Sequence, residues 1–416
     1  MVFLSIAVIF LAIYLLIKQF ETRMVLIGTG TLLCLLANDP MSGFTAFSKY
    51  MVSANLIMAI CSSMGFAMVM KHTTCDIHLV RVLSKPLSKL GFFLIPATVI
   101  VTYTINIAIP SAAGCAAAVG ATLIPLLLSS RIHPAIAGAA VLCGTIGSLL
   151  SPGLSHNPFV AEMSDLSVVE LITRHSPYSI TVGFIAAISL AVVAFVRKEF
   201  NLTSSTVSQE QTVLEKANLL YAFAPFIPLI LLVIANAELI SNFDINVPTA
   251  MIIGAIYAMV VTRGNPGEAT KSFFNGMGSA YGNILGIIIA AAVFSQGLKS
   301  SGLVSLFIDF LVHSPEFARW GGTLGPFLMG IMTGSGDAAA YAFNSTVTSQ
   351  AAVLGYQIPD LGMGVAISGA LGRTMSPLAG SVIVCAGLAG VTPLDLVKRT
   401  ALGMVTSVFF IALFML

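Results

Sequence analysis

The chain has 416 residues, of which 57% are hydrophobic and only 9% are charged, and its formal net charge is +2. A soluble domain carries roughly 25% charged residues, so lipid has to be the solvent for most of this chain. The sequence has neither a basic tract nor an alternation of aromatic and basic residues, which excludes nucleic acid as a partner.

Apolar runs follow one another along the whole chain and predict an all-α integral membrane protein. In order they cover residues 3–18, 24–37, 52–70, 91–109, 111–128, 135–155, 178–196, 218–236, 247–262, 281–298, 321–333, 338–354, 361–389 and 400–416. Two adjacent pairs meet at corners of small residues, 109–114 and 333–337. We interpret these pairs as re-entrant hairpins, 91–128 and 321–354, which leaves about ten spans. Irregular backbone at membrane depth is tolerated only where it is buried in protein or lines a polar cavity, so both corners indicate a site.

The distribution of basic residues predicts the orientation. With the N-terminus outside, 14 of the 19 Lys and Arg residues lie inside, four lie outside, and Arg373 lies within a span. The positive-inside rule favours this arrangement, which places both termini on the outer, periplasmic side. The polar segment 199–217 then becomes a cytoplasmic linker between the two halves of the chain.

The two halves share a motif. Residues 134–175 align without gaps to residues 359–400 at a shift of 225, and both copies contain G-x-x-G-x-x-x-S-P followed by [ST]-x-x-[ED]-L-[IV]-x-R. The second pattern is typical of a capped helix start and predicts short amphipathic surface helices at 167–174 and 392–399. A unit with an odd number of spans enters the membrane upside down in its second copy. We therefore expect two inverted repeats, 1–198 and 218–416, each with five spans and one hairpin, as in secondary transporters.

The shared glycines and proline predict that spans 135–155 and 361–389 are broken. The residues concerned are Gly144, Gly147, Pro152, Gly369, Gly372 and Pro377. A broken helix offers N–H groups to carboxylates and carbonyls to cations. The alternative is that the glycines allow close helix packing and the prolines only kink the helix.

Arg373 is the only basic residue predicted deep in a span, and its planar guanidinium matches a carboxylate. Asp337 is the only acid predicted at that depth. It could take a coupling proton, bind Na⁺, or form a structural ion pair with Arg373. Substrate contacts are further expected from polar or small residues at the corners and breaks: Ser111, Gly114, Ser335, Gly336, Ser151, Ser376, Asn106, His156 and Asn157. Thr333 and Asn344 are expected to assist Asp337 in coupling.

Two other classes of protein are alternatives to a transporter. Residues 334–337 match G-x-G-D, a pattern of intramembrane aspartyl proteases, but that chemistry needs two carboxylates and no second acid is predicted at depth. A passive channel is the other alternative. The absence of HExxH, GxSxG, P-loop and CxxC motifs predicts no enzyme, no transition metal and no organic cofactor.

Four blocks carry a resemblance to a known family. They are IPSAAGCAAAVGATLIPLL and GTIGSLLSPGLSHNPFVAEM within residues 106–163, and later MTGSGDAAAYAFNSTVTSQA and ALGRTMSPLAG. Together they resemble the anaerobic four-carbon dicarboxylate carrier family DcuC, part of the ion-transporter superfamily. The resemblance implies a homodimer in the lipid of the bacterial inner membrane, with an elevator-type fold.

The same resemblance implies secondary active transport of succinate, fumarate or malate, coupled to H⁺ or Na⁺ or working by exchange. Better-known dicarboxylate carriers of that superfamily have Ser-Asn-Thr at each hairpin tip. Here the tips read Pro-Ser-Ala-Ala-Gly and Gly-Ser-Gly-Asp, so the details of Na⁺ coordination do not carry over. Another small anion or an amino acid is the alternative substrate.

Overall fold

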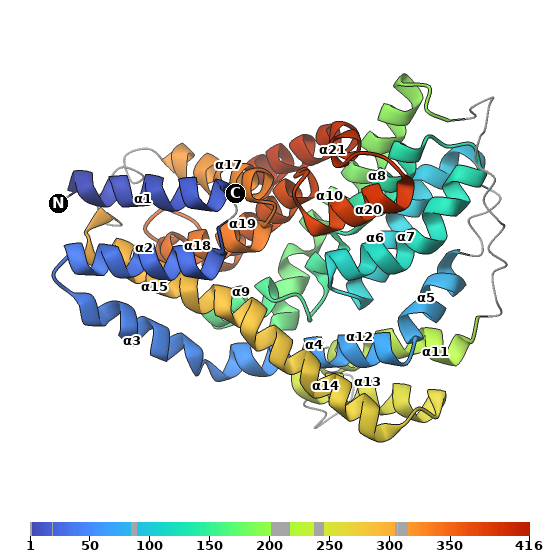
Figure 1. Ribbon diagram of the computed structural model, residues 1–416, viewed down its shortest axis with the longest axis horizontal. Coiled ribbons are helices and arrows are strands. Elements are labelled where there is room, and N and C mark those ends of the chain that lie inside the picture. Colours follow the sequence, from blue (N-terminus) through green and yellow to red (C-terminus); the bar gives the residue numbers. More distant parts are fainter. Residues whose placement is uncertain are drawn as a thin grey trace.

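The computed structural model describes residues 2–18, 20–84, 90–200, 217–236, 245–303, 306 and 315–416. Within these ranges every regular element is a helix, as the sequence predicts (Figure 1). Most of the predicted linker 199–217 lies outside the described residues.

The first half of the chain contains ten α-helices among the described residues. They are α1 (Val2–Ile17), α2 (Thr22–Leu36), α3 (Pro40–Met51), α4 (Ala54–His72), α5 (Cys75–Ser84), α6 (Leu94–Ala108), α7 (Ala112–Ser129), α8 (Pro134–Gly144), α9 (His156–Ser164) and α10 (Val168–Val196).

The second half of the chain also contains ten α-helices among the described residues. Its described helices are α11 (Leu219–Phe223), α12 (Ile227–Asn236), α13 (Val247–Thr262), α14 (Pro266–Ala280), α15 (Gly286–Ser300), α17 (Pro315–Thr333), α18 (Gly336–Thr346), α19 (Ile358–Thr374), α20 (Gly380–Ala389) and α21 (Pro393–Phe414). A π-helical turn at Tyr281–Leu285 joins α14 and α15 into one long helix, which runs diagonally across the lower part of Figure 1.

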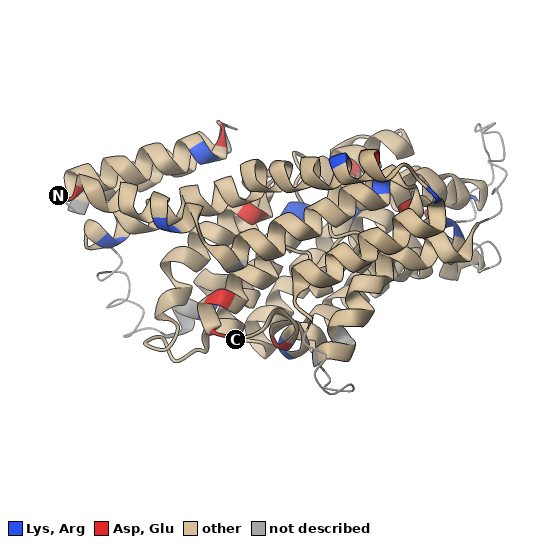
Figure 2. Cartoon of the chain, turned by 90° about the horizontal axis from the view of Figure 1, so that it is seen from below, with Lys and Arg blue, Asp and Glu red and all other residues tan. Residues whose placement is uncertain are grey.

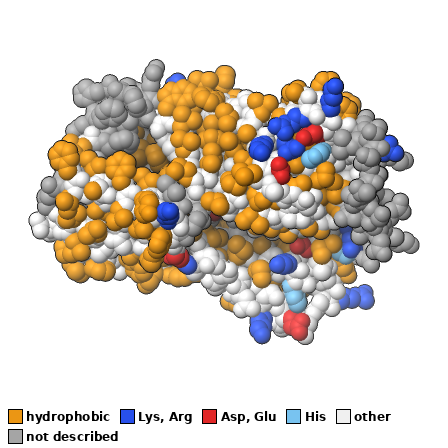
Figure 3. All heavy atoms as spheres, turned by 45° about the horizontal axis from the view of Figure 1, so that its top comes forward, with side chains coloured by type: hydrophobic (Ala, Val, Ile, Leu, Met, Phe, Trp, Pro, Cys, Tyr) orange, Lys and Arg blue, Asp and Glu red, His pale blue; other side chains and the backbone are white. Residues whose placement is uncertain are grey.

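The described helices are those of a multi-pass membrane protein. Five segments are long and apolar enough to cross a membrane: Gly91–Ala108, Ala112–Ser129, Val168–Val196, Pro266–Ser300 and Pro393–Phe414. A sixth is the pair Pro40–Met51 and Leu56–His72, if these helices, bent by 51°, form one span. Hydrophobic side chains form large patches on the surface seen in Figure 3, and Figure 2 shows few charged residues, several of them near one end of the molecule.

Two predicted features depend on how these helices sit in the bilayer. Six further apolar helices have only 10–17 residues, so the count of ten spans stays a prediction. Both arms of the first hairpin are themselves long enough to cross a membrane, so its re-entrant path also stays a prediction.

The predicted surface helices at 167–174 and 392–399 are wrong as separate elements. Both motifs do form capping boxes, Ser167 with Glu170 and Thr392 with Asp395, but α10 and α21 continue past them without interruption. In α10 the helix passes through Pro177, which cannot donate to the carbonyl four residues earlier. That carbonyl, of Thr173, instead accepts the hydroxyl of Ser176 at 2.9 Å.

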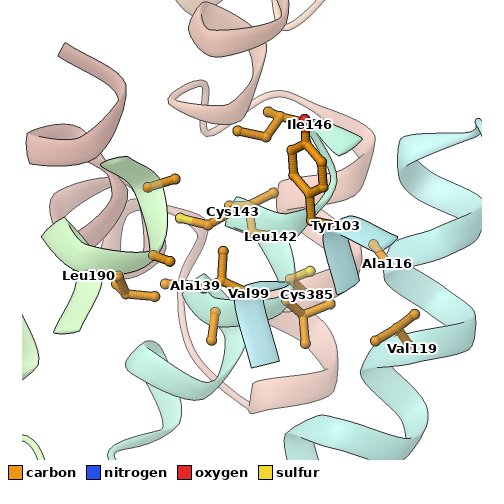
Figure 4. Close-up of a cluster of buried hydrophobic side chains, with 14 of the residues drawn as sticks. Val99, Tyr103, Ala116, Val119, Ala139, Leu142, Cys143, Ile146, Leu190 and Cys385 are labelled. Atoms are coloured by element: carbon orange, nitrogen blue, oxygen red, sulfur yellow. The ribbon is translucent and has the colours of Figure 1, made fainter. Parts of the chain in front are cut away.

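A dry core surrounds the first broken span. Every residue of α8 from Ala135 to Gly144 is buried. Figure 4 shows side chains of α8 meeting those of α6, α7, α10 and α20, so this core joins elements from both halves of the chain.

Glycines set the distance between each broken span and the first arm of its hairpin. A Cβ on Gly147 would lie 2.0 Å from the carbonyl oxygen of Tyr103 in α6, and one on Gly372 would lie 2.1 Å from that of Phe327 in α17. Neither approach is possible with a side chain. Gly147 and Gly372 are related by the shift of 225, so the same close contact is built twice.

Candidate binding site where the two broken helices meet

The two breaks share a Ser-Pro turn but differ in length. In the first copy α8 ends at Gly144, a 3₁₀ turn covers Gly147–Leu150, and α9 starts at His156. In the second copy α19 ends at Thr374 and α20 starts at Gly380. The breaks thus contain Pro152 and Pro377.

One predicted detail of the second break is corrected. Gly369 and Gly372 do not interrupt α19, which stays helical through both and ends only after them. Their missing side chains serve close packing instead: a Cβ on Gly369 would lie 2.7 Å from the carbonyl oxygen of Gly336 in α18. At these two positions the close-packing alternative is the correct one, because helix contact consumes the space that a side chain would fill.

The serine of each Ser-Pro pair shapes its turn. Ser151 Oγ accepts the amide of Gly153 at 3.3 Å, and Ser376 Oγ accepts that of Leu378 at 3.3 Å. Both serines are buried. We therefore assign these hydroxyls to the turns, where they set the directions of the following helices.

Arg373 connects the two breaks. Its Nη2 donates to the carbonyl oxygen of Thr145 at 3.3 Å, at the C-terminal, electronegative end of α8. Its Nε is buried and has no hydrogen-bond partner. In the part of the chain that the structure describes, no carboxylate lies within 4 Å of the guanidinium, so the structural ion pair with Asp337 is not formed. A partly buried cation with an unused donor is suited to an anionic ligand.

Asp337 pairs with His156 instead. His156 Nε2 lies 3.0 Å from Asp337 Oδ1, which joins the start of α9 to the start of α18. The His156 side chain is 3% exposed, whereas that of Asp337 is 54% exposed. The ring of His156 packs on Tyr341, with centroids 4.5 Å apart, and the Tyr341 hydroxyl donates to Ser155 Oγ. The accessible carboxylate of Asp337 is thus bound to a buried polar network.

The two hairpin tips are capped alike. Ser111 Oγ accepts the amide of Gly114 at 3.1 Å, and Ser335 Oγ accepts that of Ala338 at 3.4 Å. Ser111 and Gly114 are exposed at the first tip. Thr333 Oγ1 receives the amide of Ser335 at 3.2 Å and donates to a carbonyl of its own helix, so it holds the second tip in shape.

Gly336 is a packing position. It is buried, and a Cβ there would lie 2.2 Å from the carbonyl oxygen of Gly369 in α19. Gly334, two residues earlier, has φ +74°, a conformation that glycine adopts without strain. The second tip can therefore approach α19 only with glycine at both places.

Three predicted asparagines brace the backbone. Asn106 accepts the amide of Ser148 at 2.6 Å and donates to Ile109, which ties the first tip to the first break. Asn157 donates to two carbonyls of that break, at 2.9 and 2.8 Å. Asn344 donates to Gly362 at 3.1 Å. All three are fully buried, so they position the site while other groups face its interior.

Sequence reasoning missed two members of this network. His175, which follows the predicted surface helix 167–174, is 1% exposed in α10, where its Nε2 lies 3.3 Å from Asn157 Oδ1 and its Nδ1 lies 2.9 Å from Ser179 Oγ. Tyr341 is the second; it follows Asp337 by four residues and so shares its helix face. Among the described residues, no three His, Cys, Asp or Glu side chains gather as metal ligands.

Comparison with known proteins decides the family. The family model "DcuC: C4-dicarboxylate anaerobic carrier" matches residues 3–416. The chain belongs to the DcuC family. The resemblance of its four sequence blocks is thereby confirmed.

Relatives agree with this placement, and a solved structure shares the fold. A Haemophilus influenzae protein named as a transporter is 51% identical over 279 residues, which are 64% of this chain and 100% of that protein. The Vibrio cholerae "Probable anaerobic C4-dicarboxylate transporter DcuC" is 29% identical and covers 94% of this chain and 93% of its own length. The structure of Neisseria gonorrhoeae MtrF, described among antimetabolite efflux pumps, superimposes with a TM-score of 0.66 at 13% identity, over 92% of this chain and 84% of its own. This last similarity concerns the fold alone.

Proposed function

We propose that this DcuC-family protein is a secondary active transporter of four-carbon dicarboxylates, such as succinate, fumarate and malate, in the bacterial inner membrane. The observation that carries the proposal is Arg373, partly buried where the two breaks meet, with a buried, unpartnered Nε and no carboxylate of the described chain within 4 Å. The names of the Vibrio cholerae and Escherichia coli relatives give the same class of substrate.

In the proposed complex one substrate carboxylate binds the guanidinium of Arg373. The second carboxylate meets free amides at a hairpin tip or at the start of a helix that follows a break. The start of α20 offers such groups, and the hydroxyl of Ser381 in its first turn is buried without a partner.

Coupling is assigned to Asp337 and His156. A carboxylate and an imidazole 3.0 Å apart can together gain or lose a proton, and this would offset part of the negative charge that a dicarboxylate brings. Binding of Na⁺ by Asp337 is the alternative coupling step, and exchange of two dicarboxylates needs neither ion.

The motion we propose is of the elevator type. Hairpins 91–128 and 321–354 move with the broken spans 135–155 and 361–389, while the remaining spans form the scaffold and the contact of a homodimer. The proposed inverted repeats are residues 1–198 and 218–416. What supports them is that both halves have the Ser-Pro turn and the glycine contact with the hairpin. In this arrangement both termini lie in the periplasm.

The other classes of protein fit less well. An intramembrane protease of the G-x-G-D kind needs a second carboxylate beside Asp337, and its partner within the described chain is His156. A channel or a carrier of another small anion or amino acid predicts different solutes, and these are outcomes of the same experiment.

The test is uptake of radiolabelled succinate into proteoliposomes with H⁺ and Na⁺ gradients imposed separately. We expect saturable uptake, driven by one gradient and competed by fumarate. Conductance without saturation would identify a channel. Absence of both uptake and counterflow would overturn the dicarboxylate assignment, and basic amino acids would be tried next.

A further inference from the structure

A cavity separate from the breaks lies between α3, α15 and α18. Its volume is about 460 Å³, within the range of small-molecule sites. None of Arg373, Asp337 and His156 lines it. The cavity therefore needs its own explanation.

Two lysines from different helices face this cavity, Lys49 of α3 and Lys299 of α15. In the described part of the chain, neither has a carboxylate within 4 Å, and their charges are near enough to act on each other. One acid also belongs to the lining: Asp39, whose Oδ2 accepts the hydroxyl of Ser300 at 3.3 Å. The lining thus carries two positive charges and one negative charge, and both lysine ammonium groups are available to bind an anion.

One residue of the lining has a buried hydroxyl. Ser345 of α18 is 7% exposed, lines the cavity, and its Oγ has no hydrogen-bond partner. The carbonyl of Ser345 accepts the hydroxyl of Ser295 at 2.7 Å, which fixes α18 against α15. A buried donor without a partner costs free energy unless a ligand or water satisfies it, so a polar ligand is favoured here.

The cavity is connected to the proposed transport site through one helix. Ser345 follows Asp337 by eight residues in α18, about 12 Å along the helix axis at 1.5 Å per residue. In the predicted topology Lys49 and Lys299 lie on the periplasmic side. A ligand held by the lysines would therefore lie next to the hairpin that carries the coupling acid.

We propose that this cavity is a loading site, where a dicarboxylate from the periplasm binds Lys49 and Lys299, beside Ser345, before it reaches Arg373. The inference rests on the proposed function for the identity of the ligand. Clefts with unpaired charges of one sign raise the local concentration of oppositely charged solutes, and exposed lysines release them readily. The same chemistry would accept the anionic headgroup of a lipid, so the experiment separates these two ligands.

The first measurement is the KM for succinate in proteoliposomes made without anionic lipid. We expect Lys49→Gln/Lys299→Gln to raise KM about five- to tenfold with little change in maximal rate, because exposed charge pairs contribute modestly. Asp39→Asn removes the repelling charge and should lower KM. Lys271→Gln is the matched control, an exposed lysine near the other end of the same long helix. An unchanged KM in the double variant would overturn the loading site.

The second measurement does not need transport. A cysteine introduced for Ser42, which lines the cavity, is labelled with a maleimide in the presence and absence of succinate. Succinate should slow labelling in the Arg373→Ala background too, and should lose this effect when both lysines are Gln. Protection in a protein that keeps Arg373 but shows no succinate transport would refute the proposed function and leave the cavity site standing. Protection by anionic lipid and not by succinate would replace the dicarboxylate with a headgroup.

Discussion

The two broken helices have backbone features in common but differ in their charged residues. Both breaks use a buried Ser-Pro turn, and both preceding helices pack on a hairpin through glycine. Yet Arg373 stands where the first copy has Ser148, and Asp337 stands where it has Ala112. The first copy contributes the carbonyl of Thr145 and the imidazole of His156 to the groups of the second. The backbone features are therefore duplicated, whereas the charged and polar groups of the site come from both halves.

Removal of Arg373 should break this division most severely. Arg373→Ala leaves the dicarboxylate without its partly buried cation and should reduce transport by about two orders of magnitude or more, since charged hydrogen bonds shielded from solvent contribute several kcal/mol. Ser148→Ala, at the equivalent position, keeps the amide that bonds Asn106 and should retain near-normal transport. Initial rates of succinate uptake, compared at equal amounts of inserted protein, measure both. Normal uptake by Arg373→Ala would remove this residue from the site.

Loss of Asp337 should separate coupling from transport. Asp337→Asn keeps a hydrogen bond to His156 but cannot take up a proton, so gradient-driven accumulation should fall to equilibrium while counterflow continues. Tyr341→Phe is the control, because it keeps the ring contact with His156 and removes only the hydroxyl that binds Ser155. Accumulation by Asp337→Asn at the wild-type level would exclude the carboxylate from coupling.

The close glycine contacts should matter equally in both copies. A methyl group at Gly147 or Gly372 would overlap a backbone carbonyl, which overpacks the contact and should cost about 1–3 kcal/mol in each case. Gly387→Ala in α20 is the control, because nothing lies within 4 Å of a Cβ there. Thermal unfolding in detergent, measured by dye binding, reports the difference in stability between these variants. A large effect in only one copy would show that the repeats are not packed alike.

Local features of this fold could be predicted from the sequence, and pairings across it could not. Both corners lie between helices, at 109–111 and 334–335, because small residues and a capping serine act within a few positions. The role of Gly369 was misjudged, since only the neighbouring helix decides whether a glycine breaks a helix or packs against one. The contact of His156 with Asp337 spans 181 residues and has no local signal.

The smallest expected effects concern two ion pairs that link the repeats. Arg174 of α10 binds Asp360 at the start of α19, and Arg399 of α21 binds Glu199 beyond the end of α10. The two arginines are equivalent in the repeat, but the Arg174 side chain is 40% exposed and that of Arg399 only 6%. Solvent weakens an exposed pair, and removal of one partner from a buried pair leaves the other charge uncompensated.

Arg174→Gln should therefore lower the free energy of unfolding by less than about 1 kcal/mol, and Arg399→Gln by about 2 kcal/mol. The larger loss has a second cause, because Arg399 Nη1 also donates to the carbonyl of Asp395 at 2.7 Å. Restoring neutrality with Glu199→Gln in the Arg399→Gln background should recover part of the loss, whereas Asp360→Gln should change little beside Arg174→Gln. Equal losses at the two arginines would mean that bilayer or partner surfaces equalise their surroundings, and burial within one chain would then not distinguish the two repeats.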